Sequence, residues 1–146
     1  MSDRTELHKL QSMLKLIYIA LIIPTAFSAL FALGVLKISG PQEHLSADLV
    51  MTWSVVAFSL NLVGFLVQMV RLKPERVAKS KRPHVTVMSA FVVSWATFEL
   101  SALIGATLTY LGSEENVSAL TLLALLALLA HPPTEGKLKR ALSAQR

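Results

Sequence analysis

The chain has 146 residues, of which 53% are hydrophobic, and it carries a formal net charge of +5. This length allows one domain, and we expect a single membrane domain over residues 1–146. The absence of cysteine excludes disulfides, thiolate metal sites and a cysteine nucleophile. The positive charge does not indicate nucleic-acid binding, because the basic residues stand beside and between apolar segments, where membrane orientation explains them.

Four apolar segments follow one another along the chain. They cover residues 14–38, 49–70, 85–111 and 113–131. The first three reach or exceed the roughly 20 apolar residues that a helix needs to cross a bilayer. The pattern predicts an all-α integral membrane protein, a four-helix bundle built from two transmembrane hairpins.

The fourth segment needs its polar start to reach a spanning length. Ser113 is a suitable N-cap, and Glu114 and Glu115 suit a first turn near the positive end of the helix dipole. Pro132 and Pro133 then end the helix. We therefore predict a fourth span over residues 113–131.

The charges predict the topology. All of the 14 lysines and arginines except Lys37 lie before the first segment or at its edge, between the second and third, or after the fourth. Because positive residues stay on the cytoplasmic side, both termini and the basic loop 71–84 are expected in the cytoplasm. We expect a multi-pass protein of the inner (plasma) membrane. A cleaved signal peptide is the less favoured interpretation of the first segment, because its apolar run is too long.

The basic loop is also a candidate contact for anionic lipid headgroups, since each basic residue near the surface contributes about 1 kcal/mol of attraction. A topology signal alone is the simpler interpretation. The candidate residues are Arg71, Lys73, Arg76, Lys79, Lys81 and Arg82.

Glu99 is a lone acid in the apolar stretch from Ser94 to Gly105. An ionisable residue inside a membrane segment is a functional candidate by default. Loss of hydration disfavours the ionised form, so we expect a neutral, hydrogen-bonded carboxyl. Trp95, one turn away, is expected to shield it.

Asn61 and Ser28 lie near the middle of their own segments, at the depth of Glu99. Pro24 lacks an N–H and frees a backbone carbonyl close to Ser28. We therefore predict a cluster of Glu99, Asn61 and Ser28 that binds H⁺ or Na⁺. The alternative is that these groups only hold the helices together.

Small residues predict a packing face. Ser101, Gly105 and Thr109 recur every four residues in the third segment, and Gly64 lies in the second. Small residues at this spacing let another helix approach closely, either inside the bundle or in a neighbouring protomer.

The sequence has no Gly-rich phosphate loop, no His pair at metal spacing and no Ser-His-Asp set. We therefore expect no enzyme, no catalytic residues, no metal site and no cofactor other than H⁺ or Na⁺.

The stretch from Ala96 to Gly105 resembles the carboxylate helix of rotor-ring proteolipids, the c-type subunits of ATP synthases. The basic loop that ends in Arg82-Pro83 is similar to the loop of that hairpin. The resemblance implies that Glu99 carries a proton or sodium ion. Gly64 stands alone in a helix where that family has several glycines.

Three functions compete on this sequence. The first is a non-catalytic accessory or structural subunit that assembles with itself or with other membrane subunits in the lipid bilayer. The second is a proton- or cation-binding unit built around Glu99. The third is a four-helix exporter that exchanges protons for cationic molecules, although its usual acid belongs in the first helix, which here has none.

Overall fold

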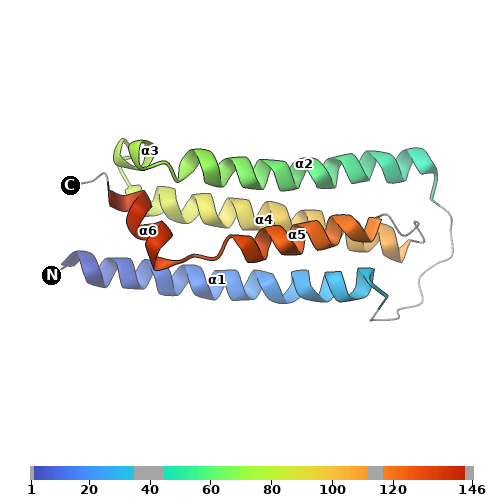
Figure 1. Cartoon of the computed structure of the whole chain (residues 1–146), viewed down its shortest axis with the longest axis horizontal. Helices are drawn as coiled ribbons and strands as arrows, with labels where there is room; N and C mark the ends of the chain where they lie inside the picture. Colours follow the sequence, from blue (N-terminus) through green and yellow to red (C-terminus); the bar gives the residue numbers. More distant parts are fainter. Residues whose placement is uncertain (1, 35–44, 112–116, 144–146) are drawn as a thin grey trace.

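The computed structural model describes residues 2–34, 45–111 and 117–143 of the chain. Within these ranges every regular element is a helix and there is no strand (Figure 1), which confirms the predicted all-α class for this part of the chain. The helices are α1 (Ser2–Ala32), α2 (Ala47–Arg71), α3 (Pro74–Ala78), α4 (Pro83–Tyr110), α5 (Ser118–Ala130) and α6 (Glu135–Leu142).

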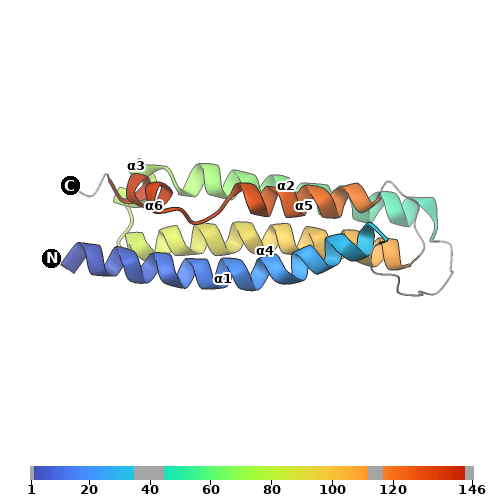
Figure 2. The same ribbon diagram turned by 60° about the horizontal axis from the view of Figure 1, so that its bottom comes forward.

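Four of the helices, α1, α2, α4 and α5, lie side by side along the long axis of the molecule (Figure 1). Helix α4 contacts each of the other three. The short helices α3 and α6 contact each other at the end of the bundle where the N-terminus lies (Figure 2). Polar groups on α4 therefore have a neighbouring helix on several sides.

The helix boundaries depart from the predicted ones mainly at α1. This helix begins at Ser2 rather than at residue 14, because Leu10 and Leu14 are spaced to face the core and are 6% and 0% exposed. The predicted loop 71–84 contains α3, which starts on Pro74 at the first helical position. The predicted end of the first helix at residue 38 lies outside the described residues, as do Ser113, Glu114 and Glu115.

In the part of the chain that the structure describes, three helices are long and apolar enough to cross a membrane. They cover Thr5–Ala32, Ala47–Arg71 and Pro83–Tyr110. Helix α5 has 13 residues, or about 20 Å, which is shorter than a hydrocarbon core of about 30 Å. It reaches a spanning composition only together with α6, from which it is bent by 69°. Three of the four predicted spans are thus present, and they indicate a membrane protein.

Large apolar side chains gather at one end of the bundle. We call this end, made of α6 and of residues 5–14 and 71–91, the end cap. Burial of large apolar groups away from water stabilises such a core at about 25 cal/mol per Å². Its buried side chains are Leu10, Leu14, Val77, Val87, Phe91 and Leu138.

The rest of the bundle packs through small and polar side chains together with Trp95, Phe98 and Leu128, which are completely buried. Water is absent from a lipid core, so helices there associate by close packing and hydrogen bonds rather than by burial of large apolar groups. The buried residues of this second part include Thr25, Ala57, Ser101, Ala102, Gly105, Thr121 and Ala124.

An apolar belt surrounds this second part. On α1 the exposed large apolar side chains run from Met13 to Leu33, which is about 30 Å along a helix and close to the thickness of a lipid core. Trp53 and Tyr110 are exposed near the far end of the belt, as aromatic residues at a membrane interface are.

Candidate functional site

Asn61 of α2 forms its side-chain hydrogen bond with Ser101 of α4 and not with Glu99. The Asn61 side-chain amide donates to the Ser101 hydroxyl at 2.7 Å and to the Ala57 carbonyl at 3.3 Å. The Ser101 hydroxyl in turn donates to the Ala57 carbonyl at 2.9 Å. Asn61 is 7% exposed, so these bonds pair groups that would otherwise be costly to bury.

At Gly64, α2 and α4 approach each other closely. A Cβ on Gly64 would lie 2.7 Å from the Phe98 ring and would overlap the Thr97 hydroxyl. The Ser94 hydroxyl donates to the Gly64 carbonyl at 2.7 Å. Glycine at this position thus allows two backbones to be joined through one short side chain.

Gly105 gives α4 a similar contact with α5. A Cβ on Gly105 would overlap the Thr121 hydroxyl and lie 3.2 Å from the Thr121 backbone nitrogen. The Thr109 hydroxyl donates to the Gly105 carbonyl at 2.9 Å within its own helix. The small residues of α4 therefore serve packing inside this chain.

Glu99 points away from this network. It lies two residues before Ser101, which faces α2, so its side chain is about 160° away around the helix. It is half-buried. Among residues 2–34, 45–111 and 117–143, no donor or cation lies within hydrogen-bond or ion-pair distance of its carboxylate.

The first helix lies beside Glu99. The Tyr18 and Trp95 ring centroids are 5.1 Å apart and those of Phe31 and Tyr110 are 6.0 Å apart, so α1 and α4 run in parallel. This register puts Glu99 level with residues 20–22, one turn before Pro24. Ser28 lies further along α1 and is half-buried.

The predicted cluster of Glu99, Asn61 and Ser28 is therefore not assembled as a hydrogen-bonded site. Asn61 is occupied by Ser101, on the other side of α4 from Glu99. The register puts Glu99 level with the turn of α1 before Pro24, and Pro24 lacks the N–H that would donate to the Ala20 carbonyl.

Trp95 also has a role that the sequence does not predict, at the end of α5. It is completely buried, and its indole N–H donates to the His131 carbonyl at 3.0 Å. The Tyr18 hydroxyl donates to the Leu128 carbonyl, also at 3.0 Å. Both bonds satisfy carbonyls at the C-terminal end of α5, which a helix cannot pair internally.

The His131 side chain completes the end of α5. Its Nδ1 lies 2.7 Å from the Ala127 carbonyl oxygen. Its ring packs against the rings of Phe65 and Phe98, with centroid distances of 5.6 and 5.8 Å. The two prolines that follow predict where the helix ends. Nothing in the local sequence predicts that Trp95 and Tyr18, far away in the chain, supply the capping donors.

The end cap carries the predicted basic residues, and all six are exposed. Among the described residues, the ion pairs are His84 with Glu6 at 3.7 Å and Lys139 with Glu135. The six basic side chains of segment 71–82 make neither of these pairs.

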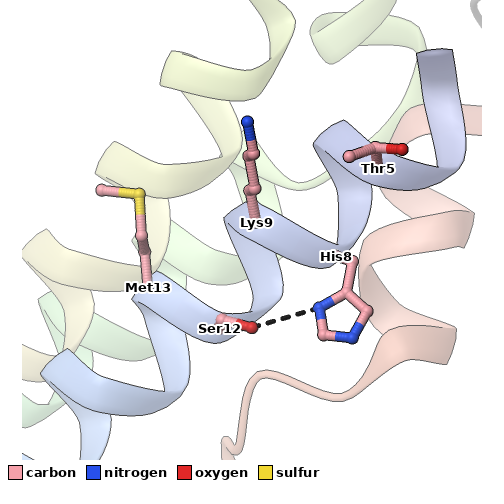
Figure 3. A pocket seen from close by; sticks show the side chains of 5 residues that line it. All are labelled: Thr5, His8, Lys9, Ser12 and Met13. Carbon is pink, nitrogen blue, oxygen red and sulfur yellow. Dashed lines mark hydrogen bonds between the residues drawn. The ribbon is translucent and has the colours of Figure 1, made fainter.

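Two hollows lie on the end cap. One is a shallow depression on α1, where His8 Nδ1 lies 3.2 Å from the Ser12 hydroxyl (Figure 3). Another, of about 440 Å³, lies between α1 and α6 and is lined by Gln11 and Glu135. A hydrogen bond from Lys139, together with its charge, lowers the pKa of Glu135.

Comparison with known proteins adds no family to these observations. No family model matches the chain, and neither a curated protein nor a solved structure matches it. Within the described residues no three His, Cys, Asp or Glu side chains lie together in a way that could hold a metal ion. The resemblance to rotor-ring proteolipids stays a prediction from the sequence.

Proposed function

We propose that this protein is a non-catalytic, multi-pass membrane subunit that assembles with another membrane chain through the face of α4 around Glu99. The observation that carries the proposal is the half-buried Glu99 carboxylate, for which the described residues supply no donor. An ionisable group in the middle of a membrane helix costs roughly 2.5–3.5 kcal/mol. A neighbouring chain that brings a donor would offset this cost.

The other faces of α4 support this choice of surface. Ser101 faces α2 and Gly105 faces α5, so those faces are filled from within the chain. On the Glu99 side, Ala96 and Leu103 are exposed one turn before and one turn after the acid. A small residue next to a polar one suits close approach of another helix.

The proposal includes four spans and cytoplasmic termini. Helix α5 lies at the same depth as the other three, and the residues before it, from Ser113, would complete the fourth span. The end cap carries the basic segment 71–82. By the positive-inside rule, that end would lie in the cytoplasm and the helices would span the inner (plasma) membrane. There the exposed basic side chains would contact anionic headgroups.

Site-specific photo-crosslinking in native membranes tests the assembly. A photoreactive residue at Leu103, beside Glu99, should give a cross-linked product with a membrane chain. The same residue at Leu126, which is 62% exposed on α5, is the matched control and should give none. Glu99→Leu should abolish the Leu103 product. Equal labelling at both positions, or none at either, would overturn the proposal.

Binding of a proton or cation at Glu99 is a second candidate function, and the same donor-free carboxyl favours it. Infrared absorption of the carboxyl stretch, with Glu99→Gln as the blank, distinguishes the two. A band that disappears between about pH 5 and 9, or that shifts with sodium, would support an exchangeable ion site. A band that never moves would support a purely structural acid.

A further inference from the structure

The depth of Glu99 is fixed relative to α2 by two contacts. Ser101 donates to the Ala57 carbonyl, and Ser94 donates to the Gly64 carbonyl. Seven residues along α4 thus correspond to seven residues along the antiparallel α2. Glu99, two residues before Ser101, is therefore level with Ser59, two residues after Ala57.

Ser59 faces outward, on the side of the helix pair opposite to Glu99. It is two residues from Ala57, which is buried against α4, and so points about 160° away from it. Ser59 is exposed within the apolar belt. Among the described residues, no hydrogen bond satisfies its hydroxyl.

The two groups are chemically complementary. A serine hydroxyl both donates and accepts, so it can pair with the Glu99 carboxyl group whether that group is ionised or protonated. All copies of a membrane protein that insert in one orientation keep each residue at one depth. The outer face of α2 in one copy can therefore meet the Glu99 face of another copy with these two groups at the same level.

We propose that the partner at the Glu99 face is a second copy of this chain, bound head to tail, with Ser59 of one copy donating to Glu99 of the next. This inference rests on the proposed function and names the partner for it. A two-fold arrangement would instead bring Glu99 against itself and leave the Ser59 hydroxyl without a partner. A head-to-tail contact uses two different faces, so it can repeat into a ring or a row.

The cysteine-free sequence makes the proposal directly testable by disulfide cross-linking. The same register makes Ala96 level with Leu62, and Leu103 level with Val55, and all four residues are exposed. Two differently tagged single-cysteine variants, Ala96→Cys and Leu62→Cys, would be reconstituted together in phosphatidylcholine vesicles and oxidised. We expect a mixed disulfide, and a weaker one when Ala96→Cys is paired with Val55→Cys, which lies at the wrong depth.

The hydrogen bond itself is tested by Ser59→Ala and Glu99→Leu. Each should weaken self-association about three- to twentyfold, the range for one interhelical hydrogen bond in a membrane, and the double variant should be no weaker than Glu99→Leu alone. Fully additive losses would overturn the pairing.

The cross-linking results separate this inference from the proposed function. Ala96→Cys that forms a disulfide only with itself would overturn the head-to-tail contact and indicate a two-fold dimer. A Leu103 photo-crosslink to a different chain, without any mixed disulfide, would overturn self-association and leave the assembly role in place. Absence of both products would overturn both.

Discussion

The side-chain amide of Asn61 donates to the hydroxyl of Ser101 across the contact between α2 and α4, at 2.7 Å. Because this contact turns Ser101 toward α2, it also turns Glu99, two residues earlier, toward the outside. Ser101 therefore contributes to packing inside the bundle, while Glu99 faces outward, toward the proposed partner chain.

Replacement of Asn61 by alanine should destabilise the bundle by about 1 kcal/mol, within the range for interhelical hydrogen bonds in membranes. The physical reason is the loss of the bonds to Ser101 and to the Ala57 carbonyl. Unfolding in a detergent titration measures it. Ser59→Ala, in the same helix but exposed, is the control for stability of the single chain and should change little. Equal effects of the two variants would contradict the assignment.

Gly64→Ala should destabilise the protein by about 1–3 kcal/mol, the usual cost of overpacking. The added Cβ would lie 2.7 Å from the Phe98 ring and 3.0 Å from the Ser94 carbonyl, which belongs to a backbone that cannot rotate away. Gly136→Ala is the matched control, because a Cβ there meets nothing within 4 Å. Thermal unfolding of the two variants in detergent gives the comparison.

The Gly105 contact should behave differently, because its main obstacle is one side chain. Gly105→Ala would place its Cβ against the Thr121 hydroxyl. Adding Thr121→Ala removes that hydroxyl and should recover much of the lost stability. If the double variant unfolds as easily as Gly105→Ala alone, the contact between α4 and α5 is not the one described.

Hydrophobicity and charge predict the long helices well, because each must be apolar over the thickness of a bilayer. The start of α1 was predicted too late because residues 2–13 are mostly polar and become helical by packing on the end cap. Here Leu10 and Leu14 are buried against α6, whose Leu138 lies far away in the sequence. A local window of sequence contains no sign of that contact.

The candidate site was predicted by depth alone, and depth does not give direction. Asn61 and Glu99 lie near one level, but α4 turns about 160° between Glu99 and the residue that meets Asn61. The helical period of α4 places Glu99 and Ser101 on opposite faces of that helix. It does not tell which of the two faces contacts α2. The same reason explains why Trp95 and Tyr18 were not recognised as caps for α5.

The pKa of Glu135 should respond to its neighbour Lys139. The Lys139 hydrogen bond and charge lower the pKa of this carboxyl, so the pair stabilises α6 above the ordinary pKa of a glutamate and this contribution is lost as the pH falls through the lowered value. Lys139→Gln should raise the pKa, while Lys139→Arg should leave it low. A carboxyl-detected NMR titration measures both. The effect on stability should be small, because both side chains are largely exposed.

Trp95→Phe and Tyr18→Phe should each destabilise the C-terminal end of α5. Each variant keeps an aromatic ring but removes the only side-chain donor described for one carbonyl, at His131 or at Leu128. Leaving a buried carbonyl without its donor costs about 1–3 kcal/mol, and the Leu128 carbonyl, which also accepts from the His131 N–H, should lose less. Hydrogen exchange of α5 amides should accelerate most in Trp95→Phe. Tyr110→Phe, an exposed ring near the other end of the bundle, should leave that exchange unchanged, and an equal acceleration there would contradict this account of the helix end.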